Sequence, residues 1–334
     1  MSQVIPVRGP FFEELAVGAV LDTAPAVTLT SGMQAVHHAV VGSRLRLTLD
    51  AQLATEVTGG PVVSPALVWD VSIGQSTGFT QHVLANLFYR GLGFRRFPQL
   101  GDTLSTRTTV VALKENSRRP GRPASGLAVL RIETRDQDDR PVLDYWRCAM
   151  LPLSAGAAPT SASDDVTAIG LDRSPEELTE PVREWRLDLI RSKFPGLHFS
   201  DLSPGLRWDV IGADVVSSGP ELARLTGNLA TVHHDAVAAG GSRLVYGGHT
   251  IGLALHQVTR ALPNLVTVVG WNRCDHVGPV RDGDLLSSRV AVEAVHAWPH
   301  GGGLVDLAVG VVASGSDREE PASVLEWHLT VVMA

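Results

Sequence analysis

Four runs of mostly alternating apolar and polar residues predict β-strands with one buried face. They span residues 105–112, 126–133, 287–293 and 304–312. Each pair of runs follows a longer segment that is apolar around most of its helical circumference, at about 64–75 and 248–261. A helix of that kind has to be enclosed by other structure. We therefore expect an α+β fold in which a curved antiparallel sheet wraps around a central apolar helix, and we expect this unit twice.

The two sets of elements follow the same order along the chain, which indicates an internal repeat. The segment 12–18 is echoed by 199–205, both with the pattern Phe-x-x-Leu-x-x-Gly. Much later, a Gly-Asp pair at 101–102 is echoed by another at 283–284, and each pair leads into an alternating run. The two halves are therefore colinear, with small differences in length.

A segment rich in Ala, Ser, Thr, Pro and Asp lies between the repeats, from about residue 155 to residue 176. Such a composition is typical of a linker between domains. We predict a first unit over residues 1–154, a linker over residues 155–194 and a second unit over residues 195–334.

Composition and charge exclude several classes of protein. With 334 residues, 44% of them hydrophobic and 19% charged, the chain can bury a large core and is not globally disordered. A net charge of -7 without a block of Lys or Arg argues against a nucleic-acid or anionic-membrane partner. No stretch reaches about 18 uninterrupted apolar residues, so no membrane span is expected. Two cysteines outside any CxxC motif, and no signal-peptide pattern at the N-terminus, favour a cytoplasmic location.

The most distinctive polar residues lie in the second repeat. Asn228 and His233 stand five positions apart, directly after Gly227. Further along, Gly247 and Gly248 open the second apolar helix. An imidazole can take a proton from water, and amides at a helix start can stabilise a carbonyl oxygen that gains negative charge. This stretch predicts a site that activates a water beside a bound carbonyl.

A metal site is not expected at this stretch. His233, His234 and Asp235 are adjacent, and neighbouring residues rarely converge on one ion. In the first repeat, His37 and His38 lie in a helical-looking surface segment, where we expect both side chains to be solvated.

The ordered set of motifs resembles the MaoC-like hydratase family, whose members have the hotdog fold. The family pattern Gly-Asp-x-Asn-Pro-aliphatic-His is similar to residues 227–233, and its aliphatic-(Tyr/His)-Gly-Gly/Met segment is similar to residues 244–248. The Phe-x-x-Leu-x-x-Gly start and the Pro-Val-x-x-Gly-Asp segment at 279–284 also fit. The resemblance covers nearly the whole chain and implies a double hotdog, with each chain a monomer or part of a homodimer.

Within that family the chain looks most like the mesaconyl-CoA hydratases, also called β-methylmalyl-CoA dehydratases. The likeness rests on Phe-Phe-Glu-Glu at 11–14, Gly-Asp-Thr-Leu-Ser-Thr at 101–106 and Tyr-Gly-Gly-His at 246–249. It implies that water is added to, or removed from, an enoyl-CoA thioester, with a branched or carboxylated acyl group as one candidate. It implies no cofactor beyond the CoA of the substrate.

The resemblance also implies roles for the candidate site residues of the second repeat. His233 would act as the base, Asn228 would position the water, and the backbone N–H of Gly248 or of a neighbour would stabilise the enolate oxygen. Gly247 would let the thioester approach closely, because it has no Cβ. Tyr246 would either donate to the ligand or pack beside it.

Three further positions bear on how the site is built. His249 would either cap the helix or face the substrate. The first repeat has Ser43 and Thr48 where the family has Asp and His, so we expect one active site per chain. The first repeat would then supply part of the acyl-CoA tunnel.

One departure from the family pattern leaves other functions open. The usual family Asp is Asn228 here, and an amide cannot take up a proton. A non-catalytic acyl-CoA-binding protein is therefore one alternative. A thioesterase is the other, since hotdog proteins also hydrolyse acyl-CoA.

Overall fold

Twelve strands form the framework of the chain, six in each half, in a computed structural model that describes residues 5, 7–170, 172–315 and 318–334. The first half contributes β1 (Val20–Leu21), β2 (Val27–Thr28), β3 (Ala85–Phe94), β4 (Thr103–Glu115), β5 (Ser125–Arg135) and β6 (Pro141–Pro152). The second half contributes β7 (Arg207–Asp209), β8 (Asp214–Val215), β9 (Leu265–His276), β10 (Leu285–Ala297), β11 (Gly303–Ser314) and β12 (Ala322–Met333).

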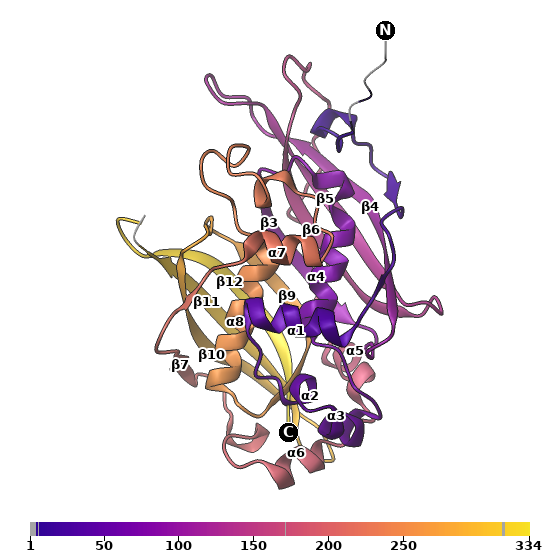
Figure 1. Ribbon diagram of the computed structural model, residues 1–334, viewed down its shortest axis with the longest axis vertical. Coiled ribbons are helices and arrows are strands. Elements are labelled where there is room, and N and C mark those ends of the chain that lie inside the picture. Colours follow the sequence, from indigo (N-terminus) through magenta and orange to yellow (C-terminus); the bar gives the residue numbers. More distant parts are fainter. Residues whose placement is uncertain (1–4, 6, 171, 316–317) are drawn as a thin grey trace.

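All twelve strands belong to one antiparallel sheet, which runs unbroken through both halves (Figure 1). Its order is β1-β4-β5-β6-β3-β9-β12-β11-β10-β7, with β2 beside β4 and β8 beside β10. The order is symmetric about the seam between β3 and β9, where Tyr89 pairs with Cys274 and Gly93 with Gly270. The expected internal repeat and the α+β class are confirmed, and every alternating run of the sequence lies in one of these strands.

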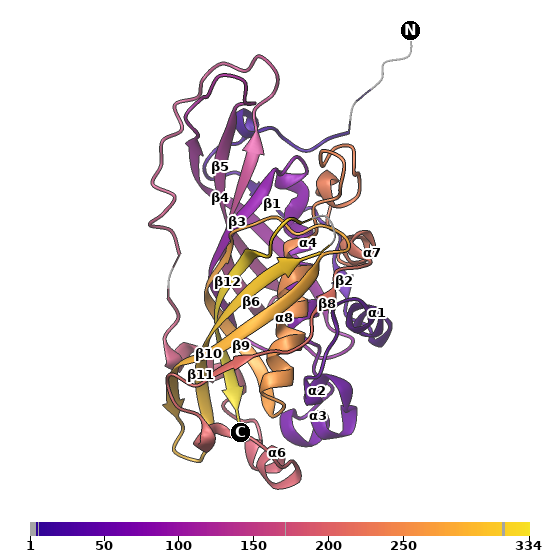
Figure 2. The ribbon, with the colours of Figure 1, turned by 90° about the vertical axis from the view of Figure 1, so that its left-hand side faces the viewer.

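Two central helices lie on the concave side of the sheet, side by side across the symmetry axis (Figures 1 and 2). They are α4 (Pro65–Gln75) and α8 (Gly247–Ala261), within one residue of the predicted bounds. Every residue of α4 is buried, as its apolar circumference requires. Trp69 of α4 meets Trp271 and Trp327 of the sheet edge-to-face, with ring centroids 4.7 and 6.3 Å away.

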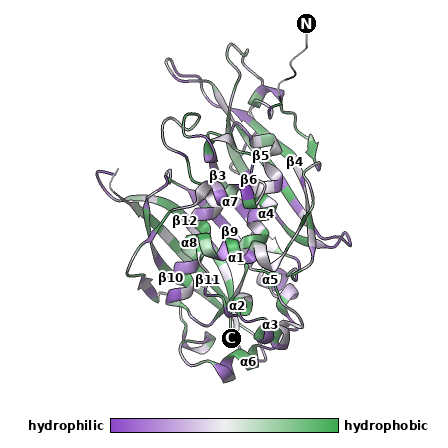
Figure 3. Ribbon diagram, viewed as in Figure 1, coloured by the Kyte–Doolittle hydropathy of each residue, from purple (hydrophilic) through white to green (hydrophobic). Residues whose placement is uncertain are grey.

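The remaining helices lie around this core. The α-helices are α1 (Ser31–Val41), α2 (Arg46–Leu49), α3 (Ala51–Thr58), α5 (Pro175–Thr179), α6 (Leu187–Lys193) and α7 (Gly219–Leu225). The 3-10 helices are η1 (Phe12–Glu14), η2 (Ser76–Thr80), η3 (Glu180–Val182), η4 (Phe199–Asp201) and η5 (Thr231–His233). Both hydrophobic and hydrophilic residues occur along the strands (Figure 3), as expected of strands with one buried face. No helix within the described residues has the length and apolar character that a bilayer crossing needs.

The prediction that His37 is solvated is wrong. Helix α1 packs against α7 and α8 of the other half, and its buried face carries Gln34, His37 and Val41. The His37 side chain is fully buried, and its Nε2 lies 2.9 Å from Oδ2 of Asp70, which is also fully buried. His38, one position further, is half-buried.

The segment after β6 crosses the outer face of the first-half sheet along the length of the molecule (Figure 2). Val166 packs there on Ala112, Val129 and Cys148. Helices α5, η3 and α6 follow within the predicted linker. The division into units 1–154, 155–194 and 195–334 stays a prediction, because one sheet joins the two halves.

Candidate active site

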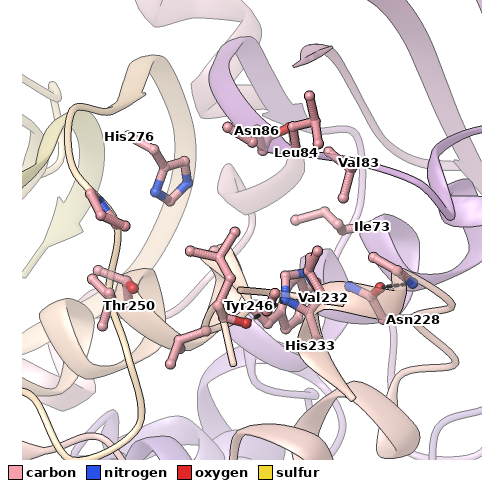
Figure 4. A pocket seen from close by; sticks show the side chains of 18 of the residues that line it. Ile73, Val83, Leu84, Asn86, Asn228, Val232, His233, Tyr246, Thr250 and His276 are labelled. Carbon is pink, nitrogen blue, oxygen red and sulfur yellow. Dashed lines mark hydrogen bonds between the residues drawn. The ribbon is translucent and has the colours of Figure 1, made fainter. Parts of the chain in front are cut away.

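A cavity of about 420 Å³ lies between the two halves, beside the start of α8 (Figure 4). The first half contributes Ile73, Thr77, Val83, Leu84, Ala85, Asn86, Tyr89 and Arg147 to its lining. Most of the second-half lining comes from the two predicted motifs and the end of β9, and it includes Asn228, Ala230, Val232, His233, Leu244, Val245, Tyr246, Gly247, Thr250 and His276. The cavity thus depends on both halves of the chain.

The loop that carries Asn228 and His233 is fixed to the first half. Gly227 has φ +69°, a value that glycine adopts without strain, and it turns the chain out of α7. The backbone N–H of Leu229 donates to Oγ1 of Thr77 at 2.9 Å. The N–H of Thr231 donates to the Gln81 carbonyl at 3.0 Å. These bonds place η5, and with it His233, against η2.

His233 has the protonation and orientation of a base. Its Nδ1 lies 2.7 Å from the carbonyl oxygen of Leu244, which can only accept, so Nδ1 carries the proton. The lone pair is then on Nε2, and the ring lines the cavity. Burial lowers the pKa of His233 to about 4. The imidazole is therefore neutral at pH 7 and can accept a proton there.

Asn228 lines the same cavity but is arranged as a donor. Its side chain is buried, and its Oδ1 accepts the N–H of Ala230 at 2.9 Å. This bond leaves the N–H groups of Nδ2 for a ligand or a water. The backbone carbonyl of Asn228 also accepts from Nε2 of His234, at 2.8 Å. His234 is thereby occupied in holding the loop.

The start of α8 offers free backbone donors. No side chain caps this end of the helix, and the N–H of His249 donates to the Tyr246 carbonyl, so the N–H groups of Gly247 and Gly248 are the ones without a helical partner. Gly247 lines the cavity, and a Cβ there would lie 2.8 Å from Nε2 of His276. Gly248 faces the first half instead, and a Cβ there would lie 2.0 Å from Oδ1 of Asp70. Both positions therefore require glycine, for different contacts.

Tyr246 and His249 have different positions relative to the cavity. Tyr246 lines the cavity, and its hydroxyl donates to the backbone carbonyl of Asp70 at 3.1 Å. Its ring centroid lies 5.7 Å from that of His233, so the phenol also packs beside the base. His249 is fully buried and outside the cavity lining, and no side chain caps the start of α8, so the structure supports neither of the two roles predicted for it. Thr250, the next residue, lines the cavity, and adjacent side chains on a helix face different directions, so His249 points away from it.

Several polar residues of the cavity were not predicted from the sequence, among them Asn86, Arg147, His276 and Arg281. Asn86 and His276 lie across the cavity from His233 and Tyr246 (Figure 4). Both side-chain polar atoms of Asn86 and Nε2 of His276 are buried without a partner among the described residues. Arg147 also lines the cavity, from the inner face of β6. A charged residue at an inward position of an apolar strand was the available signal for Arg147.

This arrangement can activate water beside a polarised carbonyl. A neutral imidazole, an amide donor and free helix-start N–H groups surround one cavity that is otherwise mostly apolar. Within the described ranges, no group of three or more His, Cys, Asp or Glu side chains is placed to hold a metal ion. The chemistry that these residues support is proton transfer next to a developing oxyanion.

Known proteins share this architecture over the whole chain, although no family model matches. Mesaconyl-CoA hydratase of Cereibacter sphaeroides is 31% identical over 319 residues, covering 89% of this chain and 87% of its own length. Rv0216, a conserved hypothetical protein of Mycobacterium tuberculosis described as a double hotdog, is 49% identical. Its structure covers 99% of this chain and 100% of its own, with a TM-score of 0.93.

A MaoC domain dehydratase of Chloroflexus aurantiacus is 27% identical, with a TM-score of 0.82 and 97% of each chain covered. The same family is indicated by the fold, by the coverage of nearly the whole chain and by the motif that carries His233. The chain is a double hotdog and belongs to the MaoC-like hydratase and dehydratase family, together with mesaconyl-CoA hydratase.

Proposed function

We propose that the protein adds water to the double bond of an enoyl-CoA thioester, or removes it in the reverse direction. The single observation that carries this proposal is the orientation of His233. Its Nδ1 proton is held by the Leu244 carbonyl, so the basic Nε2 is left for the cavity. Relatives that span the whole chain carry the names of hydratases and dehydratases, which supports the same reaction.

In the proposed mechanism, an N–H of Asn228 donates to the oxygen of the attacking water, and the water donates one proton to Nε2 of His233. The hydroxyl then adds at Cβ of the acyl group, and negative charge develops on the thioester oxygen. The free N–H groups at the start of α8 stabilise that oxygen, and one such donor is worth about 3–4 kcal/mol. His233 finally returns the proton to Cα on the same face.

Asn228 does not prevent this reaction, because the mechanism asks only one residue to exchange a proton. A carboxylate at position 228 would compete with His233 for the water proton. The amide donates to the water and leaves the proton transfer to the imidazole. The low pKa of His233 keeps the imidazole in its basic form at neutral pH.

The finer features of the function are also proposals. CoA enters as part of the substrate, and no separate cofactor is required by the steps above. A branched, mesaconyl-type acyl group is one candidate, because that is the substrate in the name of the relative from C. sphaeroides. A cytoplasmic location, and a chain that acts as a monomer or a homodimer, complete the proposal.

The test is hydration of a panel of trans-2-enoyl-CoA thioesters that includes mesaconyl-CoA, followed by the loss of absorbance of the conjugated thioester. We expect hydration by the unmodified protein and none by His233→Ala. His234→Ala is the matched control, since His234 bonds to the loop and not to the water; it should keep measurable hydration. Release of free CoA would instead identify a thioesterase. Tight binding of every thioester without turnover would identify a non-catalytic acyl-CoA-binding protein.

A further inference from the structure

Two arginines are buried in the described part of the chain, and only one of them is neutralised. Arg173 pairs with Asp144, with Nη2 2.6 Å from Oδ2. Arg147 is more deeply buried, 4% exposed, and forms no ion pair with any described carboxylate. A buried charge without a partner costs several kcal/mol, so the lack of a counterion at Arg147 requires a physical explanation.

The groups around Arg147 cannot supply a negative charge. Its Nη2 donates to the hydroxyl of Thr80 at 2.9 Å, and a hydroxyl is neutral. Tyr89, its partner across the ladder, and Tyr145 are phenols whose pKa is raised by burial, so they stay protonated. Asp70 is already paired with His37.

The space that Arg147 faces is the catalytic cavity. Inward positions of β6 alternate with outward ones, and Arg147 is on the inward set, among the residues that line the cavity. Its Nε is buried without a partner. Asn86 of β3 also lines the cavity, and both of its polar side-chain atoms are buried without a partner among the described residues. A cation without a counterion and an amide without partners, both in the lining of one cavity, form a site for an anion.

We propose that Arg147, assisted by Asn86, binds a free carboxylate on the acyl group of the substrate. The protein would then act on the monothioester of an unsaturated dicarboxylic acid in preference to a plain enoyl-CoA. This inference rests on the proposed function, in the sense that it selects the substrate of the same cavity. Arg147, in a strand of the first half, would recognise the carboxylate, whereas the base, His233, belongs to the second half.

The anion could in principle be a phosphate of CoA, but the position of Arg147 favours the acyl end. Burial is the main cause of the low pKa of His233, and the positive charge of Arg147 contributes to it. Arg147 is therefore close enough to act electrostatically on the reacting centre. A long pantetheine arm separates the thioester from the CoA phosphates, which belong nearer the exposed rim, where Leu84 and Val277 lie.

Binding of unreactive analogues tests this assignment without turnover. Succinyl-CoA carries the carboxylate, butyryl-CoA has the same chain length without it, and free CoA has neither acyl group. By calorimetry, the unmodified protein should bind succinyl-CoA about 30-fold or more tightly than butyryl-CoA, as for a buried hydrogen-bonded charge pair. Equal binding of the two thioesters to the unmodified protein would overturn the proposal, whatever the variants do.

Two substitutions locate the effect. Arg147→Met should remove most of the preference for succinyl-CoA, and Arg147→Lys should keep part of it. Arg173→Met is the matched control: it also removes a buried guanidinium, but outside the cavity, and Asp144 keeps Arg95 and Arg131 as partners. It should retain the preference. If Arg147→Met instead weakens succinyl-CoA, butyryl-CoA and free CoA equally, the arginine binds a phosphate and the proposal is wrong.

The outcome is separable from that of the proposed function. A protein that prefers succinyl-CoA but hydrates neither fumaryl-CoA nor crotonyl-CoA has the carboxylate site and lacks the proposed activity. A protein that hydrates crotonyl-CoA as well as fumaryl-CoA, and shows no binding preference, has the activity and lacks the carboxylate site.

Discussion

Gly248 offers a sharp test of how the two halves position the oxyanion site. A Cβ at Gly248 would lie 2.0 Å from Oδ1 of Asp70 and 2.9 Å from Cε1 of Tyr246, whereas real Cβ contacts are essentially never under 3.0 Å. The carboxylate cannot swing aside easily, because Asp70 is fully buried and bonded to His37. In Gly248→Ala, the start of α8 therefore has to move away from α4 by about 1 Å.

Two opposing effects set the size of the change in stability. Replacing glycine by alanine in a helix normally stabilises a protein, by about 0.5–1 kcal/mol. Overpacking a filled core costs about 1–3 kcal/mol. The steric term is larger here, so Gly248→Ala should lower the free energy of unfolding by about 1–2 kcal/mol. A shift of about 1 Å at the oxyanion donors should also lower kcat by about 100-fold.

Gly32→Ala is the matched control, since Gly32 also occupies the second position of a helix, α1. A Cβ there meets only Oγ1 of Thr30, at an ordinary 3.8 Å. Guanidinium unfolding and hydration of an enoyl-CoA should be measured for both variants. Gly32→Ala should be neutral or slightly stabilised, with normal hydration. If Gly248→Ala behaves in the same way, the close contact between α8 and Asp70 does not hold the oxyanion donors, and the reasoning is refuted.

Two further predictions concern protons. Asn228→Asp places a negative charge beside His233, which favours the imidazolium and raises the pKa of the ring. The acid limb of the pH profile of kcat/KM should therefore move upward from about 4. An unmoved limb would show that position 228 does not act on the ring. For His249, burial lowers the pKa from 6.5 to about 4, so the unfolded chain binds a proton that the folded chain does not as pH falls between these values. Stability is then lost in that window at about 1.4 kcal/mol per pH unit for this group. The free energy of unfolding of His249→Asn, measured at pH 7.5, 6 and 5, should therefore change less steeply with pH, by that amount. An unchanged dependence on pH would contradict the assignment.

The fold was largely predictable because its periodicity is local. Alternation over seven or more residues specifies a half-buried strand, and an apolar circumference specifies an enclosed helix. For this reason α4 and α8 begin and end within one residue of the predicted positions. The symmetric strand order follows from a repeat that is visible in the sequence, but the pairing of β3 with β9 depends on contacts between the halves.

The site was predictable only for the residues on one loop and one helix start. Asn228, His233, Tyr246 and Gly247 all line the cavity. The burial of His37 and His249 depends on how helices of opposite halves pack, which a local pattern does not contain. Arg147 comes from a strand of the other half, and the register between β3 and β6 decides that it faces the cavity.

The unbroken seam between β3 and β9 has a consequence for how this protein can evolve. In a symmetric dimer of two identical hotdog chains, each substitution appears at both sites, so a residue that helps recognition at one place is repeated at its counterpart. Here the two halves are one chain with different residues at corresponding positions: the predicted counterpart of His233 in the first half is Thr48. Strand β6 can therefore change which acyl group is accepted while the loop with His233 stays constant. Because the halves are fused, a substitution that alters substrate selectivity in one half is not repeated at the catalytic residues of the other half.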